Sequence, residues 1–164
     1  MLWVESSGGP LALIAAEALP MWAGASGHDY EQACEVDGFD VIAFGADKRA
    51  LILWEEPART TFLAGPMMFA QWLYADPGTN VDRVLADTSR VEWEAGPLLD
   101  INGPMILLDA AAPGADLQID QSRGTMSAEA ISLDIPPGHY RVEAGETNPS
   151  DRTCFRLYRL VLVR

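Results

Sequence analysis

Cysteine and histidine are scarce in this chain, which has only two of each among its 164 residues. Cys34 and Cys154 are far apart and form no Cys-x-x-Cys pair, and the sequence has no His-Glu-x-x-His motif. These are the patterns that hold structural or catalytic zinc. We therefore predict a protein without a metal or a cofactor, whose two cysteines are reduced thiols.

Long hydrophobic runs are also missing. No apolar segment approaches the roughly 20 residues that a membrane-spanning helix needs. The N-terminus lacks the basic start, apolar stretch and cleavage site of a signal peptide. Hydrophobic residues still make up 49% of the chain, which is enough for a core at this length. We expect a cytoplasmic protein that has no membrane partner.

The motifs that mark common enzymes are absent. There is no Gly-x-x-x-x-Gly-Lys phosphate loop and no Gly-x-Gly-x-x-Gly dinucleotide motif. The segment Gly24–His28 is not a Gly-x-Ser-x-Gly nucleophile elbow, because its fifth residue is histidine. His28 and His139 lie beside predicted turns, so we interpret both as exposed turn residues. A pairing of Cys34 with His139, or of Ser26 with His28, stays open, but we predict no catalytic residue.

Basic residues are too few to balance the acidic ones: the chain has 11 lysines and arginines and 24 aspartates and glutamates, and its net charge is −13. Residues 1–82 hold twelve carboxylates and three bases, which gives −9, and residues 83–164 hold twelve and eight, which gives −4. Nucleic acids and anionic membranes need positive charge at the contact, so neither is a favoured partner. A basic protein is a favoured partner, although solubility alone also accounts for a strong negative charge.

The densest acidic segment begins at Asp29, ends at Asp40 and contains no basic residue. Carboxylates this close repel one another, which costs stability unless water or a partner compensates. Tyr30 and the glycine-rich loop before it suit a contact surface with an aromatic anchor. We predict a surface for a basic partner, with a merely solvated surface as the alternative and Glu55-Glu56 as the next candidate. The candidate contact residues are Asp29, Tyr30, Glu31, Glu35, Asp37 and Asp40.

Stiff turns that lead into apolar strands recur along the chain. In the first, Ser6–Pro10, two adjacent glycines allow φ angles that other residues avoid, and Pro10 suits the first residue of a strand. This turn predicts strands at residues 2–4 and 11–14. The same device recurs, at irregular spacing that excludes a repeat protein, at Gly65-Pro66, Gly96-Pro97 and Gly103-Pro104.

Two hairpins are predicted. Residues 41–44 and 50–54 are apolar and flank a five-residue loop that contains glycine. Residues 131–135 and 140–144 alternate between apolar and polar on either side of Pro136-Pro137-Gly138.

The best helix is expected at residues 79–88, with Thr79 and Asp82 as a capping box. Further strands are predicted at residues 60–63, 67–75, 90–94, 105–108, 117–119 and 153–163. Strands therefore dominate and do not alternate regularly with helices. We predict one domain over residues 1–164, mainly β, with largely antiparallel, sandwich-like sheets and one or two short helices. An α+β fold is the alternative.

Tryptophans and C-terminal arginines are assigned structural roles. The five tryptophans lie in apolar stretches, where an indole most often fills the core. Arg152, Arg156, Arg159 and Arg164 are expected to pair with the surplus carboxylates.

Segments spread over the whole chain resemble one family. The opening Trp3-Val4-Glu5-Ser6-Ser7-Gly8-Gly9-Pro10-Leu11 resembles the start of the immunity protein 21 family of bacterial polymorphic toxin systems. The later matching segments are Trp22-Ala23-Gly24, Asp29–Cys34, Gly103-Pro104, Asp109-Ala110-Ala111, Pro136–Tyr140 and Asp151-Arg152-Thr153. The motif residues in the opening segment are Trp3, Glu5, Ser6, Gly8, Gly9 and Pro10.

The resemblance implies a cytoplasmic protein that binds and neutralises a cognate toxin domain. It names no toxin and no catalytic residue. An acidic chain fits a basic toxin such as a nuclease, because complementary charge speeds association. Two other classes stay open: a small β-rich hydrolase, and a β-sandwich that binds a sugar or another small ligand. A toxin gene next to this one would favour the immunity function.

Overall fold

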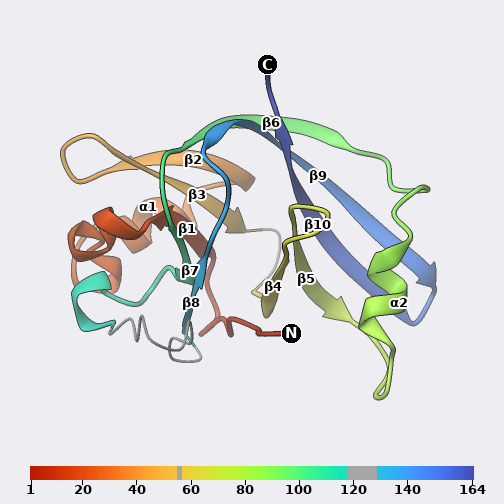
Figure 1. The fold of residues 1–164 in the computed structure, drawn as a ribbon. Coiled ribbons are helices and arrows are strands. Elements are labelled where there is room, and N and C mark those ends of the chain that lie inside the picture. Colours follow the sequence, from red (N-terminus) through yellow and green to blue (C-terminus); the bar gives the residue numbers. More distant parts are fainter. Residues whose placement is uncertain (55–56, 118–128) are drawn as a thin grey trace.

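Two five-stranded antiparallel sheets face each other in the computed structural model, which describes residues 1–54, 57–117 and 129–164 (Figure 1). The strands are β1 (Leu11–Ala15), β2 (Gly38–Phe44), β3 (Lys48–Trp54), β4 (Thr60–Leu63), β5 (Met68–Tyr74), β6 (Glu94–Ile101), β7 (Met105–Asp109), β8 (Ala130–Leu133), β9 (Gly138–Ser150) and β10 (Thr153–Leu162). Sheet 1 has the order β2-β3-β1-β7-β8, and sheet 2 has the order β4-β5-β10-β9-β6. The prediction of a mainly β, antiparallel, sandwich-like fold is confirmed.

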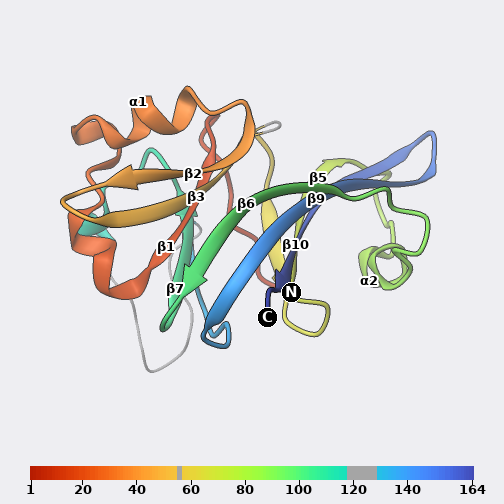
Figure 2. The same ribbon diagram turned by 90° about the horizontal axis from the view of Figure 1, so that it is seen from above.

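Short helices cover the outer faces of both sheets. The α-helices are α1 (Asp29–Cys34) and α2 (Val81–Ala86), and 3₁₀ turns occupy Ala16–Met21, Gly24–Ser26 and Gly114–Asp116. Figure 2 shows α1 beside sheet 1 and α2 at the far end of sheet 2. None of the helices in the described part of the chain has the length and hydropathy that a membrane span requires.

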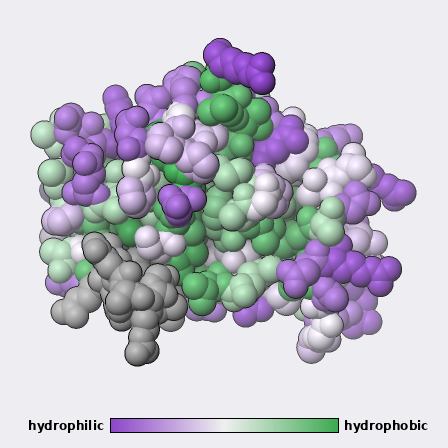
Figure 3. All heavy atoms as spheres, in the orientation of Figure 1, coloured by the Kyte–Doolittle hydropathy of each residue, from purple (hydrophilic) through white to green (hydrophobic). Residues whose placement is uncertain are grey.

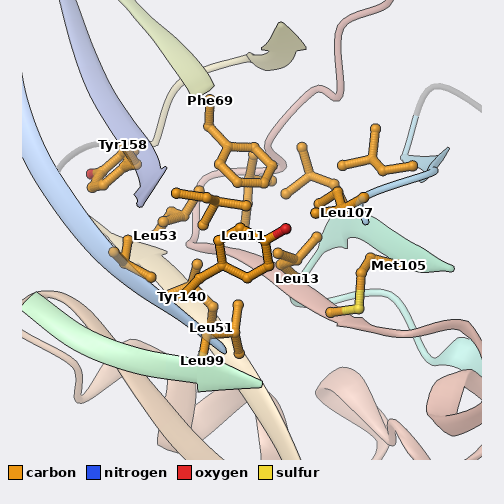
Figure 4. Close-up of a cluster of buried hydrophobic side chains, with 14 of the residues drawn as sticks. Leu11, Leu13, Leu51, Leu53, Phe69, Leu99, Met105, Leu107, Tyr140 and Tyr158 are labelled. Carbon is orange, nitrogen blue, oxygen red and sulfur yellow. The ribbon is translucent and has the colours of Figure 1, made fainter. Parts of the chain in front are cut away.

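The main core lies between the two sheets, and its side chains come from alternate strand positions. Leu11 and Leu13 of β1 point into it, together with leucines of β3 and β7, and they meet Phe69, Tyr140 and Tyr158 of sheet 2 (Figure 4). The intervening residues Ala12 and Ile14 point to the opposite face, where Trp22 packs. Because both faces of β1 and β7 are buried, these strands read as continuous apolar runs rather than as alternating ones.

The predicted hairpin over residues 131–144 is wrong. Strand β8 pairs with β7 in sheet 1, whereas β9 pairs with β10 and β6 in sheet 2. The Pro136-Pro137 segment carries the chain from one sheet to the other, and Tyr140 Oη donates a 2.7 Å hydrogen bond to the Pro136 carbonyl. Alternation shows that each strand has one buried face, but it does not identify the neighbouring strand.

The helices also differ from the prediction. The expected helix over residues 79–88 is shorter, and Asn80 rather than Thr79 caps it by accepting a 3.0 Å hydrogen bond from Arg83 N. Helices α1 and α2 each have six residues, and α1 was not predicted.

Several strand boundaries differ too. Residues 91–93 precede β6 instead of forming a strand, and Val91 and Trp93 pack over Gly145 on the outer face of sheet 2. Gly96-Pro97 lies inside β6, at an irregular step in its pairing with β9. Residues 2–4 form only one bridge, between Val4 and Thr60.

The other strands follow the sequence closely. Strands β4, β5, β7 and β10 match the predicted positions within a few residues, and β2 and β3 form the first predicted hairpin with a shorter loop. The predicted strand at residues 117–119 and the Glu55-Glu56 pair fall largely outside the described residues.

The predicted pairing is confirmed for three of the four arginines. Arg152 contacts Asp76 at 2.7 Å, Arg156 contacts Glu146 at 3.5 Å, and Arg159 contacts Glu143 at 2.6 Å. The two cysteines form no disulfide with each other.

The inter-sheet core gives a stability prediction. Leu13 is fully buried, so Leu13→Ala should lower the free energy of unfolding by about 2–5 kcal/mol. Leu162 is 57% exposed, and the matched change Leu162→Ala should alter it by less than about 0.5 kcal/mol. Urea unfolding followed by fluorescence and circular dichroism measures both, and two separate transitions would contradict the prediction of one domain.

Candidate binding surface

Hydrogen bonds brace the turn Ser6–Pro10 from within, although Ser7 and Gly8 are exposed. Ser6 Oγ donates a 2.6 Å hydrogen bond to the Gly9 carbonyl and accepts one of 3.1 Å from Gly8 N. Gly8 has a φ of 116°, a conformation that residues with a Cβ rarely adopt. The chain then enters β1 directly after Pro10. These contacts fix the path of the backbone before the first strand begins.

Asp109, at the end of β7, anchors this turn to sheet 1. Its carboxylate is 1% exposed. Oδ2 accepts hydrogen bonds from both Ser7 N (2.7 Å) and Ser7 Oγ, and Oδ1 accepts one of 3.0 Å from Ala111 N. A buried carboxylate is tolerated when donors satisfy it, and here three do so. The anchor joins positions 102 residues apart in sequence.

Tyr30 packs helix α1 against the same turn. A Cβ atom added at Gly9 would lie 2.3 Å from Tyr30 Oη, so only glycine lets the ring approach this closely. The hydrogen bond with Cys34 raises the pKa of the Tyr30 hydroxyl above its ordinary value, and partial burial and the nearby charge of Asp109 act in the same direction. Tyr30 therefore faces the turn and positions the helix.

Asp29 also has a structural contact. Its Oδ2 accepts a 2.8 Å hydrogen bond from Ala23 N. Nearby, Trp22 Nε1 donates to the Ala110 carbonyl at 3.1 Å, and Ala25 N donates to the Ala111 carbonyl at 3.0 Å. The segments around residues 6–10, 22–24, 29–30 and 109–111 therefore meet in one region of the fold.

The same segments carry the family resemblance, and a comparison with family models shows whether the chain is a member. The model described as immunity protein 21 matches residues 2–153. This chain belongs to the immunity protein 21 family. Comparison with curated proteins and with solved structures gives no match. Membership implies an immunity protein, and thus in general a toxin partner.

Trp3 and Glu5, two of the motif residues of this immunity protein, do not belong to the anchored turn. Trp3 packs edge-on against Trp72, with ring centroids 5.8 Å apart, and the Arg59 guanidinium lies over both rings. Glu5 is exposed. Trp3 therefore stabilises the outer face of sheet 2, whereas Ser6, Gly8, Gly9 and Pro10 form the anchored turn.

The acidic side chains of the immunity protein line two shallow depressions on either side of β2. One, of about 510 Å³, is lined by Gln32, Glu35, Val36, Asp37, Asp40, Ile42 and Ala43. The other, of about 390 Å³, is lined by Asp37, Gly38, Phe39, Asp40, Glu94, Ala95, Gly96 and Pro97. Asp37 and Asp40 belong to both, and neither depression has a basic residue in its lining.

Of the six candidate contact residues, four are exposed: Glu31, Glu35, Asp37 and Asp40. Asp29 and Tyr30 are half-buried and bonded to the protein, so they support the surface from beneath. Figure 3 shows hydrophilic residues gathered at the two ends of the molecule, one of which carries α1 and the β2–β3 hairpin, with a hydrophobic band between them. The structure thus separates the acidic segment into supporting and exposed residues.

The geometry gives little support to the two alternative classes, a small hydrolase and a β-sandwich that binds a sugar or another small ligand. His28 and His139 are exposed, and each contacts a carboxylate, Glu31 and Asp100 respectively. In the described residues, no group of three or more metal-binding side chains comes together.

Trp22, Trp72 and Trp93 are covered rather than open. Trp22 is 1% exposed, and the half-buried Trp72 and Trp93 have the guanidinium groups of Arg59 and Arg159 at 4.2 and 4.1 Å from their ring centroids. An open indole face is what stacking of a sugar would need. Another depression, of about 620 Å³, lies beside α2 and has a lining of mixed charge that includes Arg83, Asp87 and Arg90.

Sequence reasoning identified the turn but missed its anchor. Asp109 follows an apolar strand directly, and a carboxylate at that position is a signal for a buried hydrogen-bond acceptor. Its partner could not be inferred, because Ser7 is 102 residues away in sequence.

The contact between Gly9 and Tyr30 can be tested. Gly9→Ala should force the Tyr30 ring away from the turn and lower stability by about 1–3 kcal/mol. Gly103→Ala is the control, since a Cβ there meets no atom within 4 Å. Thermal unfolding of both variants, and of each in a Tyr30→Ala background, measures the coupling. An equal cost of Gly9→Ala with and without the tyrosine ring would contradict the contact.

Proposed function

We propose that this immunity protein binds and neutralises a basic toxin domain through the exposed carboxylates of α1 and the start of β2. The observation that carries the proposal is the pair of depressions beside Asp37 and Asp40, which have acidic and neutral linings without a compensating base. Some carboxylates elsewhere have arginine partners, such as Asp76 with Arg152 and Glu143 with Arg159. An unbalanced charge of this kind favours a partner of opposite sign.

A nuclease is the toxin class that fits best, because an enzyme that binds nucleic acid needs a basic surface. Occupation of that surface by the acidic segment would block access of the substrate. The place of action would be the cytoplasm, where a nuclease finds its target. The anchored Ser6–Pro10 turn supports the proposal because it holds α1 in one position, which reduces the ordering cost of binding.

Charge on this surface should govern the rate of association. The variant Glu35→Gln, Asp37→Asn, Asp40→Asn should associate about tenfold more slowly with the toxin domain at low salt, and its association rate should depend less on salt. A control variant, Asp82→Asn, Asp134→Asn, Asp151→Asn, has the same net charge of −10 but changes exposed carboxylates elsewhere. Stopped-flow association with the toxin domain encoded by the adjacent gene is the measurement.

Equal slowing in the two variants would show that only net charge matters and would remove the acidic surface as the contact. Absence of any complex between the wild-type protein and that domain, in co-purification of the two, would contradict the proposed function itself. Circular dichroism of each variant verifies that the fold is intact.

A further inference from the structure

Four strands terminate the two sheets, and three of their edges are blocked or short. Strand β4 is bridged by the N-terminal segment, where Val4 N donates to the Thr60 carbonyl at 2.8 Å and Thr60 N donates back at 2.9 Å. Strand β6 contains Pro97 and an irregular step in its register. Strand β8 has four residues, and three of them are buried.

Strand β2 is the exception. Its seven residues pair with β3 in an unbroken register, from Gly38 opposite Trp54 to Phe44 opposite Lys48. Only Phe44 of the seven is buried. Among the residues that the structure describes, no strand pairs with its other side. Figure 1 shows β2 on the outside of sheet 1. It is a long, regular edge that a further strand can join.

The backbone donors of this edge can be assigned. Val41 N donates a 2.7 Å hydrogen bond to Oδ1 of the preceding Asp40, so this amide is not used in the ladder with β3. In an antiparallel ladder, alternate residues direct their N–H and C=O groups to the same side. The amides of Phe39 and Ala43 therefore point away from β3 as well, and those of Asp40 and Ile42 point toward it.

The charge of the edge decides what can join it. Asp37 and Asp40 flank the open side of β2 in both depressions. A second copy of this chain would place its own Asp37 and Asp40 against them, in a protein of net charge −13, and like charges at close range are repelled. A strand with lysine or arginine side chains would instead pair with these carboxylates, and would release the Asp40 carboxylate from Val41 N.

We propose that β2 is a strand-addition site, which extends sheet 1 by one basic β-strand of the toxin domain. The backbone of the toxin strand binds the open amides and carbonyls of β2, and its basic side chains enter the two acidic depressions. This inference rests on the proposed function and adds the mode of binding to it. Main-chain pairing supplies affinity in such complexes, and the flanking side chains supply specificity.

Amide hydrogen exchange measured by NMR on the complex with the toxin domain tests the proposal. Strand addition should slow exchange at Phe39, Val41 and Ala43 by at least about tenfold, whereas Asp40 and Ile42, already bonded to β3, should change little. Contact through side chains alone would leave the exchange rates of these three amides unchanged in a complex that still forms. That result would overturn strand addition and leave the proposed function standing.

A substitution gives an independent test. Ala43→Pro removes an outward N–H without removing a bond to β3, and proline is tolerated on strand edges that face solvent. We expect the dissociation constant of the complex to rise at least tenfold, while Ala43→Thr, which keeps the N–H, leaves it within about twofold. A complex unaffected by Ala43→Pro would overturn the inference.

The fold of the proline variant is verified by unchanged NMR shifts in β1 and β7. If that variant unfolds, the exchange pattern of the wild-type complex decides the question alone. Slowed exchange at these amides without toxin, increasing with protein concentration, would identify a second copy as the occupant and would also overturn the proposal.

Discussion

A buried carboxylate holds the first turn of this protein, and the helix packed against that turn, in place. Asp109 is 1% exposed and accepts hydrogen bonds from Ser7 and Ala111, so it joins the first turn to the end of β7. Loss of the donors would leave a charge without compensation in a buried site, which is among the most unfavourable changes in a fold. Because Gly9 of the same turn receives the Tyr30 ring, the position of α1 also depends on Asp109.

Much of the fold could be read from the sequence, because apolar runs and alternation report burial directly. Strands β4, β7 and β10 lie where those patterns place them. The neighbours of a strand could not be read in this way: β8 and β9 alternate as the two arms of a hairpin would, yet they belong to different sheets. Helix α1 was missed because its acidic, six-residue segment has little apolar periodicity of its own and is stabilised by tertiary contacts such as Tyr30 on Gly9.

The acidic segment shows the same limit at the level of single residues. Composition identified Asp29–Asp40 as a candidate surface, but it could not separate residues that support the surface from residues that are exposed on it. Asp29 accepts a hydrogen bond from Ala23 N and Tyr30 contacts Gly9, whereas Glu35, Asp37 and Asp40 line depressions. That division depends on contacts with residues distant in sequence, and no local pattern encodes them.

The crossing from β8 to β9 has a consequence for how the chain assembles on the ribosome. All five strands of sheet 1 come from residues 11–133, whereas β10 and β9, which link β5 to β6 in sheet 2, follow at residues 138–162. Sheet 2 therefore cannot be completed until β9 and β10 have been synthesised, since β5 has no link to β6 without them. Sheet 1, with α1 and the β2 edge, can pair its strands before β9 and β10 have been synthesised. Synthesis adds about 5–20 residues per second. The acidic surface can therefore form while the opposite sheet still lacks the two strands that join its halves.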